Sequence, residues 1–278
     1  MSISIDLEGR VILLCGVALG GIGGATARCI AAAGATVVAV DQTQAIIDET
    51  IADVERLGGR CHGIVADLMD PAQTDPIVGD VVQRFKRLDG VANVAGGTKA
   101  HEWMPLEETP TGQFRDTLNL NLEYVFRICR DAAVSMIKRQ APGALVNVGS
   151  VSAISSAPFH GPYGAAKSGI TALTRTMAFE WGRYGIRANT VSPGAVATER
   201  VMSRRLAASS SGLSDVAPGG GSEIVFTSVD ELANTIVFLL SDLASGISGQ
   251  TLVVDSAMST KFCAGSRPFA HSKIPYQA

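Results

Sequence analysis

Short apolar runs, rich in β-branched residues, alternate along the chain with longer segments whose apolar positions recur at helical spacing. Seven of the short runs are each consistent with a strand that is buried on both faces of a sheet. The predicted strands are Val11–Cys15, Thr36–Val40, Arg60–Val65, Gly90–Val94, Ala144–Val148, Arg187–Val191 and Thr251–Val254. The predicted helices are Ala25–Ala33, Thr43–Leu57, Pro71–Arg87, Phe114–Gln140, Gly164–Tyr184 and Val229–Leu240.

This alternation of strand and helix predicts an α/β protein, with a doubly wound parallel sheet of about seven strands flanked by helices. No Pro- or Ser-rich linker interrupts the pattern before about Ala197, so a single domain is expected over residues 1–278. The Ser- and Gly-rich stretch at 199–228 is predicted to be a mobile insertion that serves as a substrate loop. Residues 256–278 are expected to form a C-terminal tail that either frays or docks as a flap.

Composition narrows the class of protein. A chain of 278 residues that is 46% hydrophobic and 18% charged can bury a sizeable core. Its net charge of −3 offers no basic field for a nucleic-acid backbone, and no apolar stretch is long enough to span a membrane. The segment 1–10 contains Asp6 and Glu8 and lacks the pattern of a secretory signal. Five scattered cysteines without a C-x-x-C pair suit a reducing compartment, so we expect a cytoplasmic protein.

A glycine-rich turn follows the first predicted strand. Gly16, Gly20, Gly21, Gly23 and Gly24 precede a predicted helix. The absence of Cβ atoms lets the backbone approach a pyrophosphate, and the N-terminus of the helix offers unpaired N–H groups. A glycine cluster alone is weak evidence, because a tight turn needs glycine for purely structural reasons.

Two carboxylates follow the next strands. Asp41 ends the second strand about 20 residues beyond the glycines, where a carboxylate binds the ribose hydroxyls of NAD and repels the 2′-phosphate of NADP. Gln42 follows it and no basic residue stands beside it, so NAD is the predicted cofactor. The structural alternative is an Asp that only starts the turn into the next helix. Asp67 suits contact with the adenine and the role of loop carboxylate or helix cap equally well.

Tyr163 and Lys167 are four residues apart on a predicted helix and therefore share one face. A phenol has a pKa of about 10, but a nearby ammonium and an oxidised nicotinamide ring both favour the phenolate. The pair alone is more often a surface pair than a site. Ser150 changes this, because it follows the strand Ala144–Val148 at the carboxyl end of the sheet, where its hydroxyl can bond the reacting oxygen.

At this spacing the chain resembles the short-chain dehydrogenase/reductase family from about Leu7 to Asp255. The resemblance implies a Rossmann fold, Ser150, Tyr163 and Lys167 as catalytic residues, and Asn121 as the residue that holds a water in the proton path from Lys167. The implied cofactor-binding residues are Gly16, Gly21, Ile22, Gly23, Asp41, Asp67, Leu68, Asn93, Ala95, Gly96, Tyr163, Lys167, Pro193, Gly194, Val196 and Thr198. Ser152, His160 and Trp103 are candidates for substrate contact, although each also suits ordinary packing.

The chain departs from the pattern of the family at three places. The distance from Gly16 to the group Gly21-Ile22-Gly23 is one residue longer, so the loop is either enlarged or uses Gly20 differently. The usual N-N-A-G is here Asn93-Val94-Ala95-Gly96, and the usual V-D-G-G is Val254-Asp255-Ser256-Ala257. We expect repacking beside Asn93, and altered subunit contacts or an altered substrate flap at the C-terminal end.

The sequence therefore predicts an NAD-dependent oxidoreductase that interconverts a secondary alcohol and a ketone, on a cyclic or otherwise hydrophobic substrate. One alternative is a ketoreductase of the 3-oxoacyl-thioester type, which more often uses NADPH. Another is a catalytically silent member of the family that acts as a binding protein. The four histidines are dispersed and predict no metal site. The resemblance also implies a homo-oligomer, either a tetramer or a dimer.

Overall fold

The computed structural model describes residues 4–203 and 226–260. Its strands are β1 (Val11–Cys15), β2 (Thr36–Asp41), β3 (Arg60–Val65), β4 (Gly90–Asn93), β5 (Gly143–Val148), β6 (Ile186–Pro193) and β7 (Thr251–Val254). Its helices are α1 (Ile22–Ala32), α2 (Gln44–Arg56), α3 (Pro71–Thr74), α4 (Ile77–Phe85), α5 (Thr111–Leu118), α6 (Tyr124–Arg139), α7 (Gly161–Gly182) and α9 (Val229–Leu240). Most of the predicted 199–228 insertion and of the 256–278 tail lies outside the described residues.

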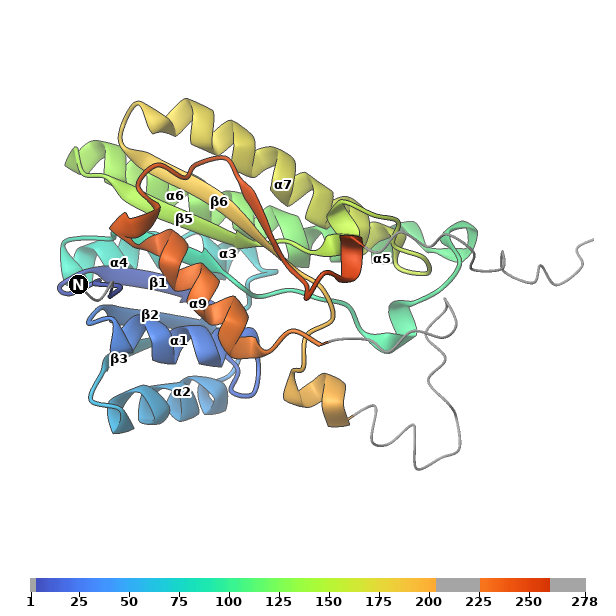
Figure 1. The fold of residues 1–278 in the computed structure, drawn as a ribbon, viewed down its shortest axis with the longest axis horizontal. Coiled ribbons are helices and arrows are strands. Elements are labelled where there is room, and N and C mark those ends of the chain that lie inside the picture. The colour runs from blue at the N-terminus through green and yellow to red at the C-terminus, as the bar shows by residue number, and fades with distance from the viewer. Residues whose placement is uncertain (1–3, 204–225, 261–278) are drawn as a thin grey trace, which may run out of the picture.

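The seven strands form one parallel sheet in the order β3-β2-β1-β4-β5-β6-β7 (Figure 1). The predicted fold class is confirmed. From β1 the chain builds outward through β2 and β3, and then returns to place β4 on the other side of β1. This reversal of strand order opens a crevice beyond the carboxyl ends of β1 and β4, which is where such sheets bind ligands.

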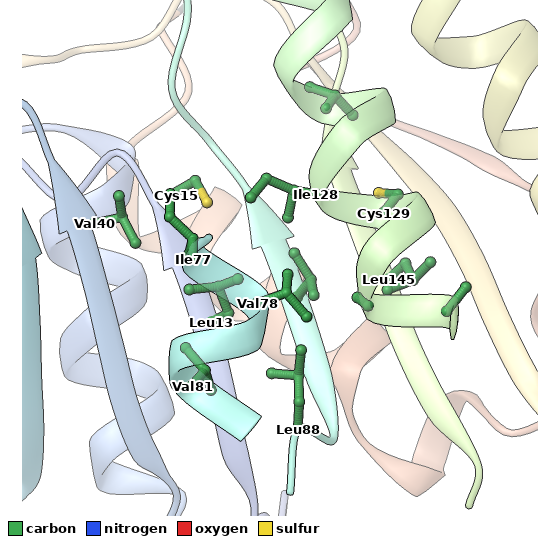
Figure 2. Close-up of a cluster of buried hydrophobic side chains, with 14 of the residues drawn as sticks. Leu13, Cys15, Val40, Ile77, Val78, Val81, Leu88, Ile128, Cys129 and Leu145 are labelled. Atoms are coloured by element: carbon green, nitrogen blue, oxygen red, sulfur yellow. The ribbon is translucent and has the colours of Figure 1, made fainter. Parts of the chain in front are cut away.

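Alternation along β1 divides the core between the two faces of the sheet. Leu13 and Cys15 point toward the layer that contains α4, α6 and α7, and Figure 2 shows them against Ile77 and Ile128 of these helices. Ile12 and Leu14 point the other way, toward α1, α2 and α9. Because side chains alternate between the faces of a strand, two helical layers can be buried only by strands that are apolar throughout.

Two predicted helices are interrupted. The segment predicted as Pro71–Arg87 forms α3 and α4 with Pro76 between them, since proline cannot donate the helical hydrogen bond. The segment predicted as Phe114–Gln140 begins at Thr111 and contains a π-helical turn over Asn119–Glu123, between α5 and α6. Such a turn adds one residue to the helical spiral and is frequent at functional sites.

Local capping explains where helix α9 begins. Helix α9 begins at Val229, as predicted, because Ser228 and Glu231 bond each other's backbone N–H groups in a capping box. Within the described ranges, no helix is both long and apolar enough to cross a membrane.

Candidate active site

A cleft of about 860 Å³ opens at the crevice between β1 and β4. Its walls come from the loops that follow β1, β2, β3, β4 and β6, together with α5. Of the residues expected to bind a cofactor, those that line the cleft are Gly16, Gly21, Ile22, Gly23, Asp41, Asp67, Leu68, Ala95, Gly96 and Thr198.

The enlarged glycine turn has a structural explanation. Gly20 has a φ of +73°, and a Cβ at this position would lie 2.2 Å from Oε2 of Glu199. The backbone N–H of Glu199 also donates to the carbonyl oxygen of Gly20, at 3.0 Å. The additional residue therefore provides the point where the segment after β6 packs onto the glycine turn, and α1 begins immediately after Gly21.

Asp41 stands at the end of β2 with both carboxylate oxygens bonded. They accept hydrogen bonds from the backbone N–H groups of Val17 and Gln42, each at 2.8 Å. Asp67 accepts from the backbone N–H of Met69 at 2.9 Å, so it shapes its own turn while also lining the cleft. Both carboxylates thus face the cleft from adjacent strands.

Six expected cofactor residues do not line the cleft, and two of them, Tyr163 and Lys167, belong to the expected catalytic group described below. Asn93 is buried, and its amide donates to Oδ1 of Asn147 at 2.9 Å. Gly194 packs against Asp255, where a Cβ would lie 2.7 Å from the Cβ of that residue. Val196 forms an isolated bridge with Thr227, and Pro193 is the last residue of β6.

The three expected catalytic side chains converge at the carboxyl ends of β5 and β6. Ser150 follows β5 and is buried, and its Oγ accepts from the N–H of Ser152 at 3.1 Å. Tyr163 lies in the first turn of α7. Burial raises the pKa of the Tyr163 phenol, and a hydrogen bond with Ser150 offsets part of that rise.

Lys167 lies one helical turn beyond Tyr163 and is only 2% exposed. Its Nζ donates to the carbonyl oxygen of Val148 at 2.9 Å and lies 5.5 Å from the centre of the Tyr163 ring. Burial lowers the pKa of this amine to about 7. The ammonium form is thus costly in this pocket, so a hydroxyl or an anion that enters beside it would be strongly favoured as a partner.

Asn121 is positioned by the π-helical turn. Its Oδ1 accepts from the N–H of Gly97 at 2.7 Å, and its Nδ2 donates to the carbonyls of Gly97 and Thr117, both at 3.0 Å. A Cβ at Gly96 would lie 2.6 Å from Oδ1 of Asn121 and 3.3 Å from Nζ of Lys167. Gly96 therefore marks where the expected catalytic residues meet the cleft.

The substrate candidates lie beside Tyr163. The rings of Trp103 and His160 are stacked, with centroids 4.5 Å apart and planes at 18°. The ring of His160 lies 5.9 Å from that of Tyr163. Ser152 contributes its backbone N–H to Ser150, as described above.

Sequence reasoning missed several residues that build the site. Gly97 and Thr98 line the cleft, although only their nearness to Gly96 in the sequence could have indicated this. Glu199 and Arg200, which also line it, begin the predicted 199–228 substrate loop. The buried Tyr124 was also missed. Its hydroxyl donates to the carbonyl oxygen of Ala95 at 2.7 Å and holds the loop after β4 in place.

A doubly wound parallel sheet with a glycine turn into its first helix and a cleft at the reversal of strand order defines the dinucleotide-binding α/β class. A family model described as enoyl-(acyl carrier protein) reductase matches residues 16–259. The chain belongs to the short-chain dehydrogenase/reductase family, whose members are oxidoreductases that use a nicotinamide cofactor.

Curated relatives cover nearly the whole chain. The 3-oxoacyl-(acyl-carrier-protein) reductase FabG of Thermotoga maritima is 34% identical over 252 residues, which are 91% of this chain and 98% of that protein. The 2,5-dichloro-2,5-cyclohexadiene-1,4-diol dehydrogenase of Sphingobium indicum is 33% identical over 255 residues, 90% and 97% of the two chains. These relatives are dehydrogenases and reductases that act on hydroxyl or keto groups.

Solved structures agree on the fold and differ in cofactor. A short-chain dehydrogenase/reductase from Burkholderia xenovorans superposes with a TM-score of 0.81 at 30% identity, covering 93% of this chain and all of its own. A structure from Beutenbergia cavernae, described as an NAD(P)-dependent gluconate 5-dehydrogenase with bound NADP, has a TM-score of 0.79 at 28% identity and coverages of 92% and 99%. A 7α-hydroxysteroid dehydrogenase complexed with NADH has a TM-score of 0.78 at 26% identity and coverages of 90% and 94%.

Proposed function

We propose that this protein is an NAD(H)-dependent oxidoreductase that interconverts a secondary alcohol and a ketone, on a cyclic or otherwise hydrophobic substrate. The observation that carries the proposal is the convergence of Ser150, Tyr163 and Lys167 where Gly96 meets the cleft. The substrate class is supported by the stacked rings of Trp103 and His160 next to Tyr163, and by a relative that is named for a cyclohexadiene diol.

The proposed mechanism assigns one role to each side chain. When bound, the nicotinamide ring exchanges a hydride with the carbinol carbon. Tyr163 takes the hydroxyl proton in oxidation and returns it in reduction, while the hydroxyl of Ser150 donates a hydrogen bond to the reacting oxygen. Lys167 in its ammonium form would bind the nicotinamide ribose and stabilise the phenolate of Tyr163 electrostatically. Asn121, together with a water, returns the proton to solvent.

The preference for NAD rests on Asp41. The lining of the cleft fits a dinucleotide. The loop after β1 is a glycine turn, and the end of β2 carries a carboxylate that two N–H groups hold in place. That charge would repel a 2′-phosphate and accept hydrogen bonds from ribose hydroxyls. The adenosine end is therefore assigned to the loops after β2 and β3, and the nicotinamide end to Gly96 and Thr198.

Replacement of Tyr163 by Phe tests the mechanism. We expect turnover to fall by at least about 10²-fold, the usual contribution of a general acid–base group, while NADH still binds. Absorbance of NADH at saturating NAD with an alcohol panel measures the rate, and nucleotide fluorescence measures binding. Tyr184→Phe, which makes the same change at an exposed position beyond α7, is the control. Full activity of Tyr163→Phe would refute the assignment.

A ketoreductase acting on 3-oxoacyl thioesters is the second candidate, and it is favoured by the 34% identity to FabG. It predicts oxidation of NADPH with an acetoacetyl thioester at a higher kcat/KM than any reaction with NADH. Asp41 argues against that outcome.

We further propose that the protein is a homo-oligomer that associates through α6 and α7. Phe126 and Val134 on α6 are exposed, and Phe179 on α7 is 89% exposed. Apolar side chains this accessible on two long helices favour burial against a second copy. Size-exclusion chromatography with light scattering gives the mass directly, and a monomer at micromolar concentration would exclude the proposal.

A further inference from the structure

Three aromatic rings form a row that leads from the surface to the proposed acid–base group. Trp103 is 53% exposed, its indole stacks on His160, and His160 lies next to Tyr163. His160 precedes α7 and stands one helical turn before Tyr163. Nothing in the proposed mechanism uses Trp103 or His160, so their arrangement requires another explanation.

Two hydrogen bonds hold the segments that carry Trp103 and His160 in place. The indole Nε1 of Trp103 donates to Oγ1 of Thr98 at 2.8 Å, and the N–H of Met104 donates to the carbonyl oxygen of Phe159 at 2.8 Å. The second bond joins the loop after β4 to the loop after β5. Phe159 also has a φ of +64°, a conformation that a bulky side chain adopts only when its surroundings impose it.

His160 has a defined tautomer. Its Nδ1 lies 2.8 Å from the carbonyl oxygen of Pro158, which can only accept a hydrogen bond, so Nδ1 carries the proton. In the neutral ring Nε2 is then an acceptor. Within residues 4–203 and 226–260, Nε2 has no hydrogen-bond partner. An oriented acceptor without a partner, beside the acid–base tyrosine, suits a hydroxyl of the substrate.

We propose that Trp103 and His160 form a subsite for a cyclic diol, in which Nε2 of His160 accepts a hydrogen bond from a second hydroxyl on the ring that carries the reacting one. The centroids of the His160 and Tyr163 rings are 5.9 Å apart, so a substrate ring whose reacting hydroxyl bonds Tyr163 would lie within reach of His160. The indole of Trp103 supplies the apolar wall at the entrance. This inference rests on the proposed function, because it concerns the substrate of the same site.

The experiment compares kcat/KM for cyclohexanol, trans-cyclohexane-1,4-diol, cis-cyclohexane-1,2-diol and 2-butanol, with NAD. For the wild type we expect at least one diol to exceed cyclohexanol by about tenfold, the value of one well-placed hydrogen bond. His160→Phe keeps a ring for the stack and removes the acceptor. In this variant the ratio of kcat/KM for the diol to kcat/KM for cyclohexanol should fall to about one.

Two further variants separate the acceptor from the wall. His160→Gln keeps a polar acceptor and should retain part of the diol preference, which also provides a second reading if His160→Phe does not fold. Trp103→Leu should lower kcat/KM for all three ring substrates and leave 2-butanol unchanged. The control His62→Phe makes the same exchange on β3, away from the cleft lining.

The outcomes distinguish failure of the proposed subsite from failure of the proposed function. The subsite is overturned, and the oxidoreductase function stands, in either of two cases. The first is that kcat/KM of the wild type for cyclohexanol equals that for the diols, and the second is that His160→Phe keeps the diol preference. If the wild type reduces NAD with none of the alcohols and oxidises NADH with none of the matching ketones, the proposed function fails and the subsite fails with it.

Discussion

The negative charge of Asp41 is fixed in place, because two backbone N–H groups hold its carboxylate at the end of β2. We predict that Asp41→Ser combined with Gln42→Arg raises the ratio of kcat/KM for NADP to that for NAD by at least about tenfold. The exchange removes the repulsion of a 2′-phosphate and adds a cation that pairs with it. Steady-state kinetics with both cofactors measure the ratio.

The matched control for this prediction makes the same two exchanges on the exposed face of α2. Gln44 and Asp48 form their own hydrogen bond there and do not line the cleft. Gln44→Arg with Asp48→Ser should leave the cofactor ratio unchanged. A ratio that stays constant in the Asp41 variant would show that another residue sets the preference.

At the scale of single residues, local spacing was predictable from the sequence and contacts between loops were not. Tyr163 and Lys167 share a helix face because they are four residues apart, and Ser150 follows a buried strand. The bond from Lys167 to Val148 and the stack of Trp103 on His160 join segments whose relative placement depends on the conformations of two irregular loops. Hydrophobic periodicity carries no information about such loops.

The turn after β7 shows what a departure from the family pattern costs at the level of an element. Ser256 and Ala257, which stand in place of two glycines, have φ values of 51° and 65°. We predict that Ala257→Gly stabilises the fold by about 1 kcal/mol, because a left-handed conformation costs an L-residue about that much. Urea denaturation followed by circular dichroism measures the change. Ala52→Gly on the exposed face of α2 should instead destabilise by about 1 kcal/mol.

The sequence predicted where helices occur better than it predicted where they are interrupted. The apolar spacing continues across Pro76 and across Asn119–Glu123, so periodicity alone joined segments that the structure divides. Pro76 was visible in the sequence as a break. The π-helical turn was not, because its additional residue is stabilised by the bonds of Asn121 to Gly97, a contact between a helix and a distant loop.

At the scale of the whole molecule, the order of the strands determines where the cleft lies. The same fold buries Lys167, and this burial affects the stability of the protein. Short strands that alternate with helices could be predicted from the sequence as a doubly wound parallel sheet, and the cleft then follows from the reversal at β1 and β4. Closing two helical layers over that sheet buries the amine of Lys167, which is 2% exposed. The fold therefore contains a cation that it holds at a cost in free energy.

This cost predicts a pH dependence of stability in the protein without cofactor. The pKa of Lys167 is about 7 in the folded state and 10.5 when unperturbed, so between these values the unfolded state binds more protons. The free energy of unfolding is therefore highest above pH 10.5, where the amine is neutral in both states, and it decreases as the pH falls toward 7. Relative to wild type, Lys167→Met should therefore be more stable at pH 7.5 than at pH 9.5, by about 2 kcal/mol.

Urea denaturation of both proteins across this range measures the difference, with Lys138→Met on the exposed face of α6 as the control. The control removes an amine on an exposed helix face, so its difference from wild type should stay constant with pH. A constant difference for Lys167→Met as well would mean that the amine keeps its ordinary pKa when buried. Saturating NADH should reduce the pH dependence of the wild type, because ribose hydroxyls bound to Nζ would stabilise its charged form and return the pKa toward its ordinary value.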